Sequence, residues 1–254
     1  MRLDDIIRVP YTTSPRMEKY EGDLLSCHDG DSLTELQRYR LNEKRKELKF
    51  QGENIWFQSD LAYHHKLVGK ACEVLGTERE TEITKLGLKI QEDIAIMHRG
   101  KLEAAFVAFP SGWKPGDKQG QSLTDLHGPV ADGKNLRRMS NKLTELMCSK
   151  YRFHRSVWTL TTSRYLSAYP DYAHPEPTSL DKLWLRIEHQ KTFCIEEGLT
   201  SGFLIYVYMI PYWFLFDSIK DKIYESINTM SDAVLNYKNL QKIKQLLINS
   251  HESL

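Results

Sequence analysis

Hydrophobic positions near the start of the chain recur at intervals typical of helices. Ser32 and Glu35 have the spacing of a capping box, which predicts that a first helix begins there. This helix would carry Leu33, Leu36 and Leu41. Lysines and arginines cluster over residues 38–49, but glutamates interleave with them, so the pattern predicts a solvated helix face.

A second helix is predicted from residue 59 or 60 to about residue 75, where Gly76 is placed to end it. Its apolar positions, which fall on one side at helical spacing, are Leu61, Val68, Cys72 and Leu75. His64 and His65 are neighbours on this helix and project about 100° apart. Adjacent residues so oriented cannot chelate one metal together, and a surface or half-buried pair is the favoured interpretation.

The pattern then changes to short apolar runs that are typical of strands. Residues 93–98 and 102–109 flank Arg99 and Gly100 and predict a β-hairpin, with His98 exposed beside the turn. A helix follows from about Asn135 to Cys148. Three further strands are predicted over residues 156–162, 183–194 and 203–212, the last two as a long hairpin, and helices over 217–227 and 231–248 end the chain.

This order of elements indicates the fold class. Helices come first, then strands with one crossover helix, then helices again, which predicts an α+β protein and not an alternating βαβ one. No change of composition along the chain marks a linker between these groups of elements. We therefore expect residues 1–80 to form a helical N-terminal extension packed on a core of residues 81–254, as one structural unit.

Composition narrows the class of partner. The 254 residues are 41% hydrophobic and 27% charged with a net charge of +1, which is ordinary for a globular protein and does not suggest nucleic acid. The most apolar stretch, residues 203–216, is broken by Pro211 and is too short to span a bilayer. Together with the absence of a signal region, this predicts a soluble cytoplasmic protein without a membrane partner.

Several kinds of site have no motif in the chain. The four cysteines contain no CxxC pair, which argues against a zinc ribbon, an iron–sulfur cluster or a disulfide scaffold and favours reduced thiols. No GxGxxG, P-loop, GxSxG or HExxH motif is present. The chain is therefore not expected to take a hydride from NAD(P)H by itself.

A long segment rich in glycine and proline, residues 108–130, contains the most distinctive histidine. His127 precedes Gly128 and Pro129, so its backbone is held by a small residue and then a rigid one. An imidazole fixed in this way can ligate a metal or heme. The alternative is a turn histidine that caps a helix.

A polar row is predicted in the strand over residues 183–194. Strict alternation puts Arg186, Glu188 and Gln190 on one face. The pattern alone favours an outward-facing surface row. If the row lined a pocket, Arg186 could pair with a carboxylate and Glu188 could orient or deprotonate a substrate.

An ordered set of motifs resembles a known family. The motifs are Gln91-Glu92-Asp93-Ile94-Ala95-Ile96-Met97, Phe109-Pro110-Ser111-x-Trp113, Lys118-x-Gly120-x-x-Leu123, Leu126-His127-x-Pro129-Val130, Leu185-Arg186-x-Glu188-x-Gln190 and Leu235-x-Tyr237-Lys238. They cover most of residues 85–248 and resemble the heme-dependent oxidative N-demethylase family, whose members include the heme-bearing subunit of dimethylamine monooxygenase.

The resemblance implies a PAS-like antiparallel sheet with flanking helices that binds heme b. It makes His127 the leading candidate for the axial iron ligand, with His154 in reserve. Phe109, Trp113 and Pro129 would belong to the wall of the heme pocket. Arg186 would meet a heme propionate or an active-site charge, and Glu188 would meet the substrate amine.

The resemblance also implies the reaction. An N-methyl group of a small alkylamine would be oxidised with O2, giving the demethylated amine and formaldehyde, with electrons from a separate reductase subunit that carries flavin and an iron–sulfur cluster. The alternatives are a PAS-like heme- or ligand-binding sensor without turnover and a structural subunit without heme. Gly112 and Thr161-Thr162 depart from the family pattern and leave the substrate open.

Overall fold

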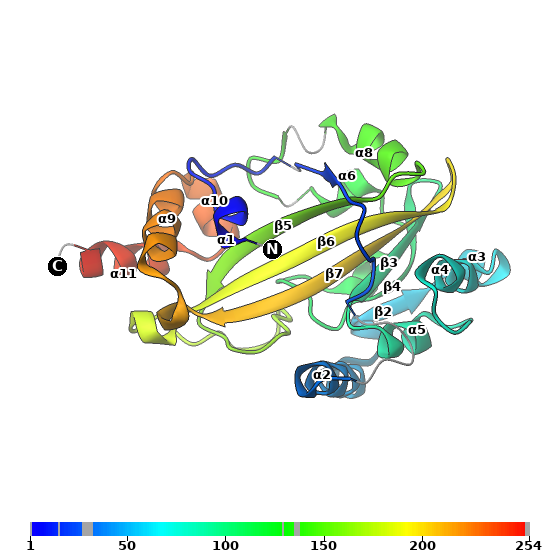
Figure 1. Cartoon of the computed structure of the whole chain (residues 1–254), viewed down its shortest axis with the longest axis horizontal. Coiled ribbons are helices and arrows are strands. Elements are labelled where there is room, and N and C mark those ends of the chain that lie inside the picture. Colours follow the sequence, from blue (N-terminus) through cyan, green and yellow to red (C-terminus); the bar gives the residue numbers. More distant parts are fainter. Residues whose placement is uncertain (1, 15, 27–32, 129, 135–137, 252–254) are drawn as a thin grey trace.

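An antiparallel sheet forms the centre of the molecule in the computed structural model (Figure 1). The structure describes residues 2–14, 16–26, 33–128, 130–134 and 138–251. The described strands are β1 (Glu18–Lys19), β2 (Trp56–Gln58), β3 (Asp93–His98), β4 (Lys101–Phe106), β5 (Phe153–Thr161), β6 (Trp184–Glu196) and β7 (Thr200–Pro211). They form one sheet in the order β1-β5-β6-β7-β3-β4-β2, and all neighbours are antiparallel.

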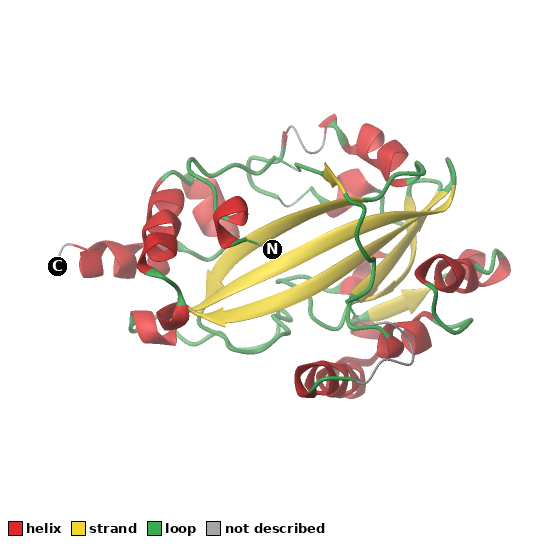
Figure 2. Cartoon of the chain, in the orientation of Figure 1, coloured by secondary structure: helices red, strands yellow, loops and turns green. Residues whose placement is uncertain are grey.

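Helices gather at both ends of this sheet (Figure 2). The described helices are α1 (Leu3–Ile6), α2 (Glu35–Gln51), α3 (Asp60–His64), α4 (Leu67–Leu75), α5 (Ile83–Lys89), α6 (Leu123–Leu126), α8 (Ser140–Met147), α9 (Asp217–Asn228), α10 (Asp232–Tyr237) and α11 (Gln241–His251). Helices and an antiparallel sheet segregated in this way confirm the α+β class. None of the helices described here has both the length and the apolar character needed to cross a bilayer.

Both predicted hairpins are present. Arg99 and Gly100 have φ angles of 49° and 75°, and this pair of positive values is what a two-residue hairpin loop between β3 and β4 requires. The β6–β7 hairpin is paired from Trp184 opposite Pro211 to Glu196 opposite Thr200. These two strands are the longest described, and they run from the end of the sheet beside α9 to the end near α8 (Figure 1).

Two helices predicted as continuous are each broken. The helix over residues 59–75 is α3 and α4, because Lys66 adopts a left-handed φ of 52°, and Leu61 is consequently exposed. The helix over 231–248 is α10 and α11, with Asn239 left-handed at φ 54° between them. Asparagine tolerates this conformation, and hydrophobic spacing continues through such a turn, so the break leaves little trace in the apolar pattern.

The start of the first helix also differs from its prediction. Ser32 lies outside the described residues, and the capping box is made by Thr34 and Gln37, each of which bonds to the backbone N–H of the other. Asn135, the predicted start of the crossover helix, is likewise outside the described residues, and α8 begins at Ser140.

Three positions expected in solvent are buried. Arg40 and Lys44 of α2 are 3% and 0% exposed, so that face of the helix is not solvated. The Nζ of Lys44 donates to the carbonyls of Gly87 and Ile90, which compensates for its loss of water. His98, which was predicted to be exposed beside the turn, is buried, with only 4% of its surface exposed.

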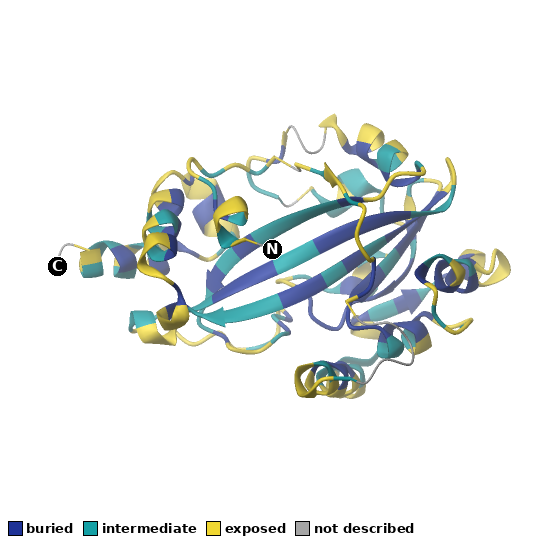
Figure 3. Cartoon of the chain, in the orientation of Figure 1, coloured by how far each residue is buried: buried dark blue, intermediate teal, exposed yellow. Residues whose placement is uncertain are grey.

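Three apolar clusters cover the two faces of the sheet. On one face, helices α3 to α5 cover Ile94 and Phe106, while α9 to α11 cover Leu185 and Ile187 of the long hairpin. On the opposite face, α6 and α8 lie over a smaller cluster around Ala105. Along β6 the buried positions come in runs, at residues 185–187 and 190–193, so both faces of this strand are covered (Figure 3). Successive residues of a strand point to opposite faces, and Leu185 and Ile187 pack against α9 to α11. The side of β6 that carries Arg186 is therefore turned away from α9 to α11.

The proposed division of the chain at residue 80 stays a prediction. β1 and β2 lie before that point and pair with β5 and β4, so the segment before residue 80 contributes two of the described strands to the sheet. The three described cysteines, Cys72, Cys148 and Cys194, are free thiols.

Candidate functional site

The polar row of β6 is not a surface row. Arg186 is 3% exposed, because the loop that follows β4 folds across this face of the sheet. Its Nε donates to the Ser111 hydroxyl at 2.9 Å and its Nη2 to the Phe109 carbonyl at 2.8 Å, while Nη1 donates to the carbonyl of Leu166. The Phe-Pro-Ser segment is thus bound to β6 through one guanidinium, and the expectation of an outward row is wrong.

Glu188 lies at the centre of a hydrogen-bonded chain. Its Oε1 accepts from the Ser111 hydroxyl, and its Oε2 accepts from Gln190 Nε2 at 2.8 Å. Gln190 Oε1 in turn accepts from Arg155 Nε on β5 at 2.7 Å. This chain of hydrogen bonds runs from Arg186 to Arg155. From each end the donors point toward Glu188, so one carboxylate accepts hydrogen bonds from both directions.

Burial lowers the pKa of both arginines, and the charge of Glu188 opposes that shift in each case. Glu188 lies near both guanidinium groups, and the charge of Asp93, which is ion-paired with Lys44, also acts on Arg186. This face of the sheet carries an excess of positive charge that an anionic group could compensate.

The start of the chain and α10 bring three more polar groups to this place. Lys238 Nζ donates to the Trp158 carbonyl at 2.8 Å, and burial lowers its pKa to about 8 against the opposing effect of Glu188. Burial raises the pKa of Tyr237, as does the charge of Glu188. Tyr11, whose pKa burial raises to about 12, lies near Tyr237 and packs edge-on against Trp158.

Sequence reasoning gave no role to these groups. Arg155 is a single charge in a strand, and only its pairing opposite Gln190 shows which face it occupies. Tyr237 and Lys238 belong to the last motif of the resemblance, which assigns them no function. Their proximity to Glu188 depends on the path of α9 and α10, which no spacing along the chain shows.

His127 caps α6 and holds one tautomer. The helix begins with a capping box between Ser122 and Asp125, and His127 follows its last residue. The Nδ1 of His127 lies 2.8 Å from the Leu123 carbonyl, which can only accept, so Nδ1 carries the proton. The other ring nitrogen, Nε2, then has its lone pair free for a metal. His127 can therefore cap the helix through Nδ1 and still ligate a metal through Nε2.

The environment of His127 keeps the imidazole neutral. The side chain is half-buried, and burial lowers its pKa; the Leu123 carbonyl opposes this, and the charge of Arg155 adds to it. The apolar residues of α6, Leu123 and Leu126, pack in the cluster around Ala105. His127 therefore lies on the same side of the sheet as Arg155 and the Glu188 row.

His154 lies on the other side. It precedes Arg155 in β5, so its side chain points to the opposite face. There its ring lies 5.0 Å from the ring of Tyr20 and 5.4 Å from that of His189. The structure thus brings His127, and not the reserve His154, to the side of Arg186 and Glu188.

The remaining predicted residues have separate positions. Trp113 packs in the same cluster as Leu126, beside α6. Phe109 is 2% exposed, and its backbone N–H donates to Asp93 Oδ2 at 2.8 Å. Pro129 lies outside the described residues. Gly112 departs from the family pattern. It has a φ of 75°, which glycine adopts readily, and a β-carbon there would meet no atom within 4 Å. The backbone conformation, and not a lack of space, therefore favours glycine at this position.

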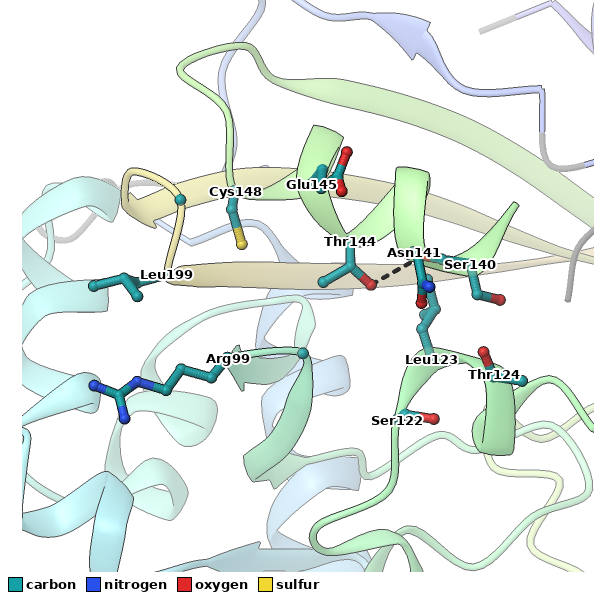
Figure 4. Close-up of a pocket in the computed structure, with 12 residues that line it drawn as sticks. Arg99, Ser122, Leu123, Thr124, Ser140, Asn141, Thr144, Glu145, Cys148 and Leu199 are labelled. Carbon is teal, nitrogen blue, oxygen red and sulfur yellow. Dashed lines mark hydrogen bonds between the residues drawn. The ribbon is translucent and has the colours of Figure 1, made fainter. Parts of the chain in front are cut away.

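A pocket of about 270 Å³ lies nearby but is distinct from this row (Figure 4). It opens between α6, α8 and the two hairpin turns, and Arg99, Ser122, Asn141 and Cys148 are among its lining residues. Neither Arg186 nor Glu188 lines it. It shares α6 with His127, whose ring is bonded to the Leu123 carbonyl.

The side chains present fit a heme. A neutral imidazole with a free Nε2 is a suitable axial ligand, and the excess positive charge of Arg155, Arg186 and Lys238 over Glu188 suits the two carboxylates that a heme carries. Within the described residues no three histidine, cysteine or acidic side chains gather as a metal site. A single axial histidine is consistent with that finding.

Comparison with known families decides the relationship. The family model for haem-dependent oxidative N-demethylase, alpha subunit-like, matches residues 49–248. The chain belongs to this family. No curated protein matches the chain. The resemblance in the ordered motifs is confirmed, and membership of the N-demethylase family implies dependence on haem and the existence of other subunits.

Proposed function

We propose that this chain is the heme b-bearing subunit of an amine monooxygenase, which removes an N-methyl group from a small methylated amine and releases formaldehyde. Electrons would come from a separate reductase subunit that carries flavin and an iron–sulfur cluster. The observation that carries the proposal is the tautomer of His127, whose Nε2 is left free on the side of the sheet that holds the Glu188 chain.

In this proposal His127 holds the iron, and Phe109, Trp113 and Pro129 contribute to the wall of the pocket. Arg155 and Arg186 would supply positive charge for the propionates, Arg186 while it keeps its hydrogen bonds to the Phe109–Ser111 segment. The open antiparallel sheet with flanking helices is what a PAS-like heme domain would provide. Bound heme supplies the oxygen activation and the oxidising power, and the chain sets ligation, access and polarity.

Glu188 is the proposed site for the substrate amine. An alkylammonium ion loses its hydration on entering the protein, and a carboxylate compensates for that loss. Two hydrogen bonds, from Ser111 and Gln190, fix the Glu188 carboxylate before substrate arrives. A fixed carboxylate orients the N-methyl group with little loss of entropy on binding. Arg186 acts on this group through Ser111 and is in that respect a positioning residue.

The test begins with the visible absorption spectrum of the full chain reconstituted with hemin, for the wild type, His127→Ala and His154→Ala. We expect a sharp Soret band in the wild type and in His154→Ala, and its shift or loss in His127→Ala. An unchanged band in His127→Ala would overturn the ligand assignment.

The reaction is tested separately by amine-dependent O2 consumption and formaldehyde release with a reductase. Heme binding without amine-dependent turnover would favour a sensor. Absence of specific heme binding in any variant would favour a structural subunit.

A further inference from the structure

Two histidines from different elements lie together at the β6–β7 turn end of the sheet. His98 is the last residue of β3, and His65 follows α3. Their ring centres are 5.2 Å apart. His98 is 4% exposed whereas His65 is exposed, so one imidazole is inside the fold and its neighbour faces solvent.

Hydrogen bonds determine the tautomer of His98. The Thr200 hydroxyl donates its single proton to Glu196 Oε2 at 2.8 Å. The same hydroxyl lies 2.7 Å from His98 Nδ1, so Nδ1 must be the donor in that contact. The lone pair of His98 is therefore on Nε2. This nitrogen is buried and has no hydrogen-bond partner, a situation that is unfavourable when nothing compensates for it.

The separation of the two rings suits a shared metal ion. With metal–nitrogen bonds of about 2 Å, two imidazoles on one tetrahedral ion have ring centres roughly 5 Å apart. The observed 5.2 Å agrees with that value. Histidine ligands usually donate their second ring N–H to an oxygen that orients them, and Thr200 and Glu196 provide this support for His98.

We propose that His98, through Nε2, and His65 bind one divalent transition-metal ion of the zinc, nickel or copper class. Water completes the coordination, since the described residues contain no group of three metal-binding side chains. Imidazole is a preferred ligand of these ions.

The charges around His98 favour a neutral ligand. Burial, then His65 and Arg99, lower the pKa of His98, while Glu196 and Glu103 oppose the shift. A histidine that is already neutral loses no proton when it binds a metal. The negative charge of Glu196 is shared with Lys70, whose Nζ lies 2.6 Å away.

This site is independent of the proposed heme site. His98 pairs with Thr200 on the face of the sheet that α3 to α5 cover, together with Ile94 and Ile96, whereas His127 lies over the other face. Failure of heme binding would leave the metal proposal intact, and the reverse also holds.

The test is a calorimetric titration of the full chain with zinc chloride, with and without hemin. We expect one equivalent to bind with the same affinity in both cases. His65→Ala should weaken binding by at least roughly tenfold. The matched control is His64→Ala, which removes the adjacent exposed histidine and should leave the affinity unchanged.

Thr200→Val provides a second variant that keeps both histidines. It removes the oxygen that orients His98 and should weaken zinc binding by about 10- to 100-fold. The proposal is overturned if the wild type binds no zinc, if His65→Ala binds as tightly as the wild type, or if His64→Ala loses as much affinity as His65→Ala.

Discussion

Glu188 shows how one carboxylate can be set in place by its neighbours. Each of its oxygens accepts a hydrogen bond, from Ser111 on one side and Gln190 on the other. The buried Arg186 and the half-buried Arg155 lie at the two ends of this hydrogen-bonded row. Since every donor is directed inward, the group is held as an acceptor, which is what recognition of a cationic amine requires.

The first prediction concerns Glu188→Gln. The substituted amide loses the negative charge, so amine-dependent formaldehyde release with hemin and reductase should fall by roughly 10- to 100-fold, the effect of one charge-assisted hydrogen bond. The Soret band should remain that of the wild type. Glu145→Gln, an exposed change on α8, is the control. Turnover at the wild-type rate by Glu188→Gln would contradict the role given to this carboxylate.

The second prediction concerns the pH dependence of stability. The pKa of Lys238 is about 8 in the folded chain and 10.5 in its ordinary state. Between these values the unfolded chain binds more protons than the folded one, so stability rises with pH through this window. The penalty for charging the half-buried Lys238 is fully present below about pH 8.

Lys238→Met removes that dependence. Urea unfolding of both proteins at pH 7 to 10 should show the wild type gaining stability relative to the variant as pH rises. Parallel curves for the two proteins across this range would mean that Lys238 is not desolvated.

At the scale of elements, α5 approaches β4 more closely than a side chain would allow. A β-carbon on Gly87 would lie 2.2 Å from the Phe106 ring. Gly69 in α4 has a different neighbourhood, since its nearest atom is Arg79 Nε at 3.3 Å, on a flexible side chain. Helix α5 can therefore pack this closely on the sheet because Gly87 has no side chain.

These two glycines form a matched pair. Gly87→Ala should destabilise the chain by about 1–3 kcal/mol, because the Phe106 ring must move within a packed core. Gly69→Ala should be neutral or stabilising by up to about 1 kcal/mol, the ordinary gain of alanine in a helix. Chemical denaturation of both variants measures the difference. Equal effects at the two positions would show that the close approach of α5 is not required.

At the scale of the molecule, a ligand held by His127 should stabilise the whole fold. Binding to the folded state alone contributes about 2.7 kcal/mol at a hundredfold excess over the dissociation constant. For a chain of this size that corresponds to a rise in melting temperature of roughly 5–10 °C. Thermal scans with hemin should show this rise for the wild type and His154→Ala and a smaller one for His127→Ala. An equal rise in all three would place the ligand elsewhere.

The sequence predicted the elements better than their surroundings. Period-two spacing located β6 and β7 and the row of Arg186 and Glu188, because pleating is a local property of the chain. It could not show that a distant loop covers this row. The burial of His98 and Lys44 likewise depends on tertiary packing and was missed. The candidate site needs Arg155, which only strand register places opposite Gln190.

The register of the long β6–β7 hairpin has a consequence for the chemistry of the chain. Leu185 and Ile187 face the helices α9 to α11, and Arg186 and Glu188 face the opposite side. A slip of one residue would exchange these faces and bury two charges in an apolar core. The hairpin turn at Gly198 and the bulge beside Glu196 fix that register. A change of chain length at this turn would thus act as a change in the composition of the candidate site, although no residue of the site had been replaced.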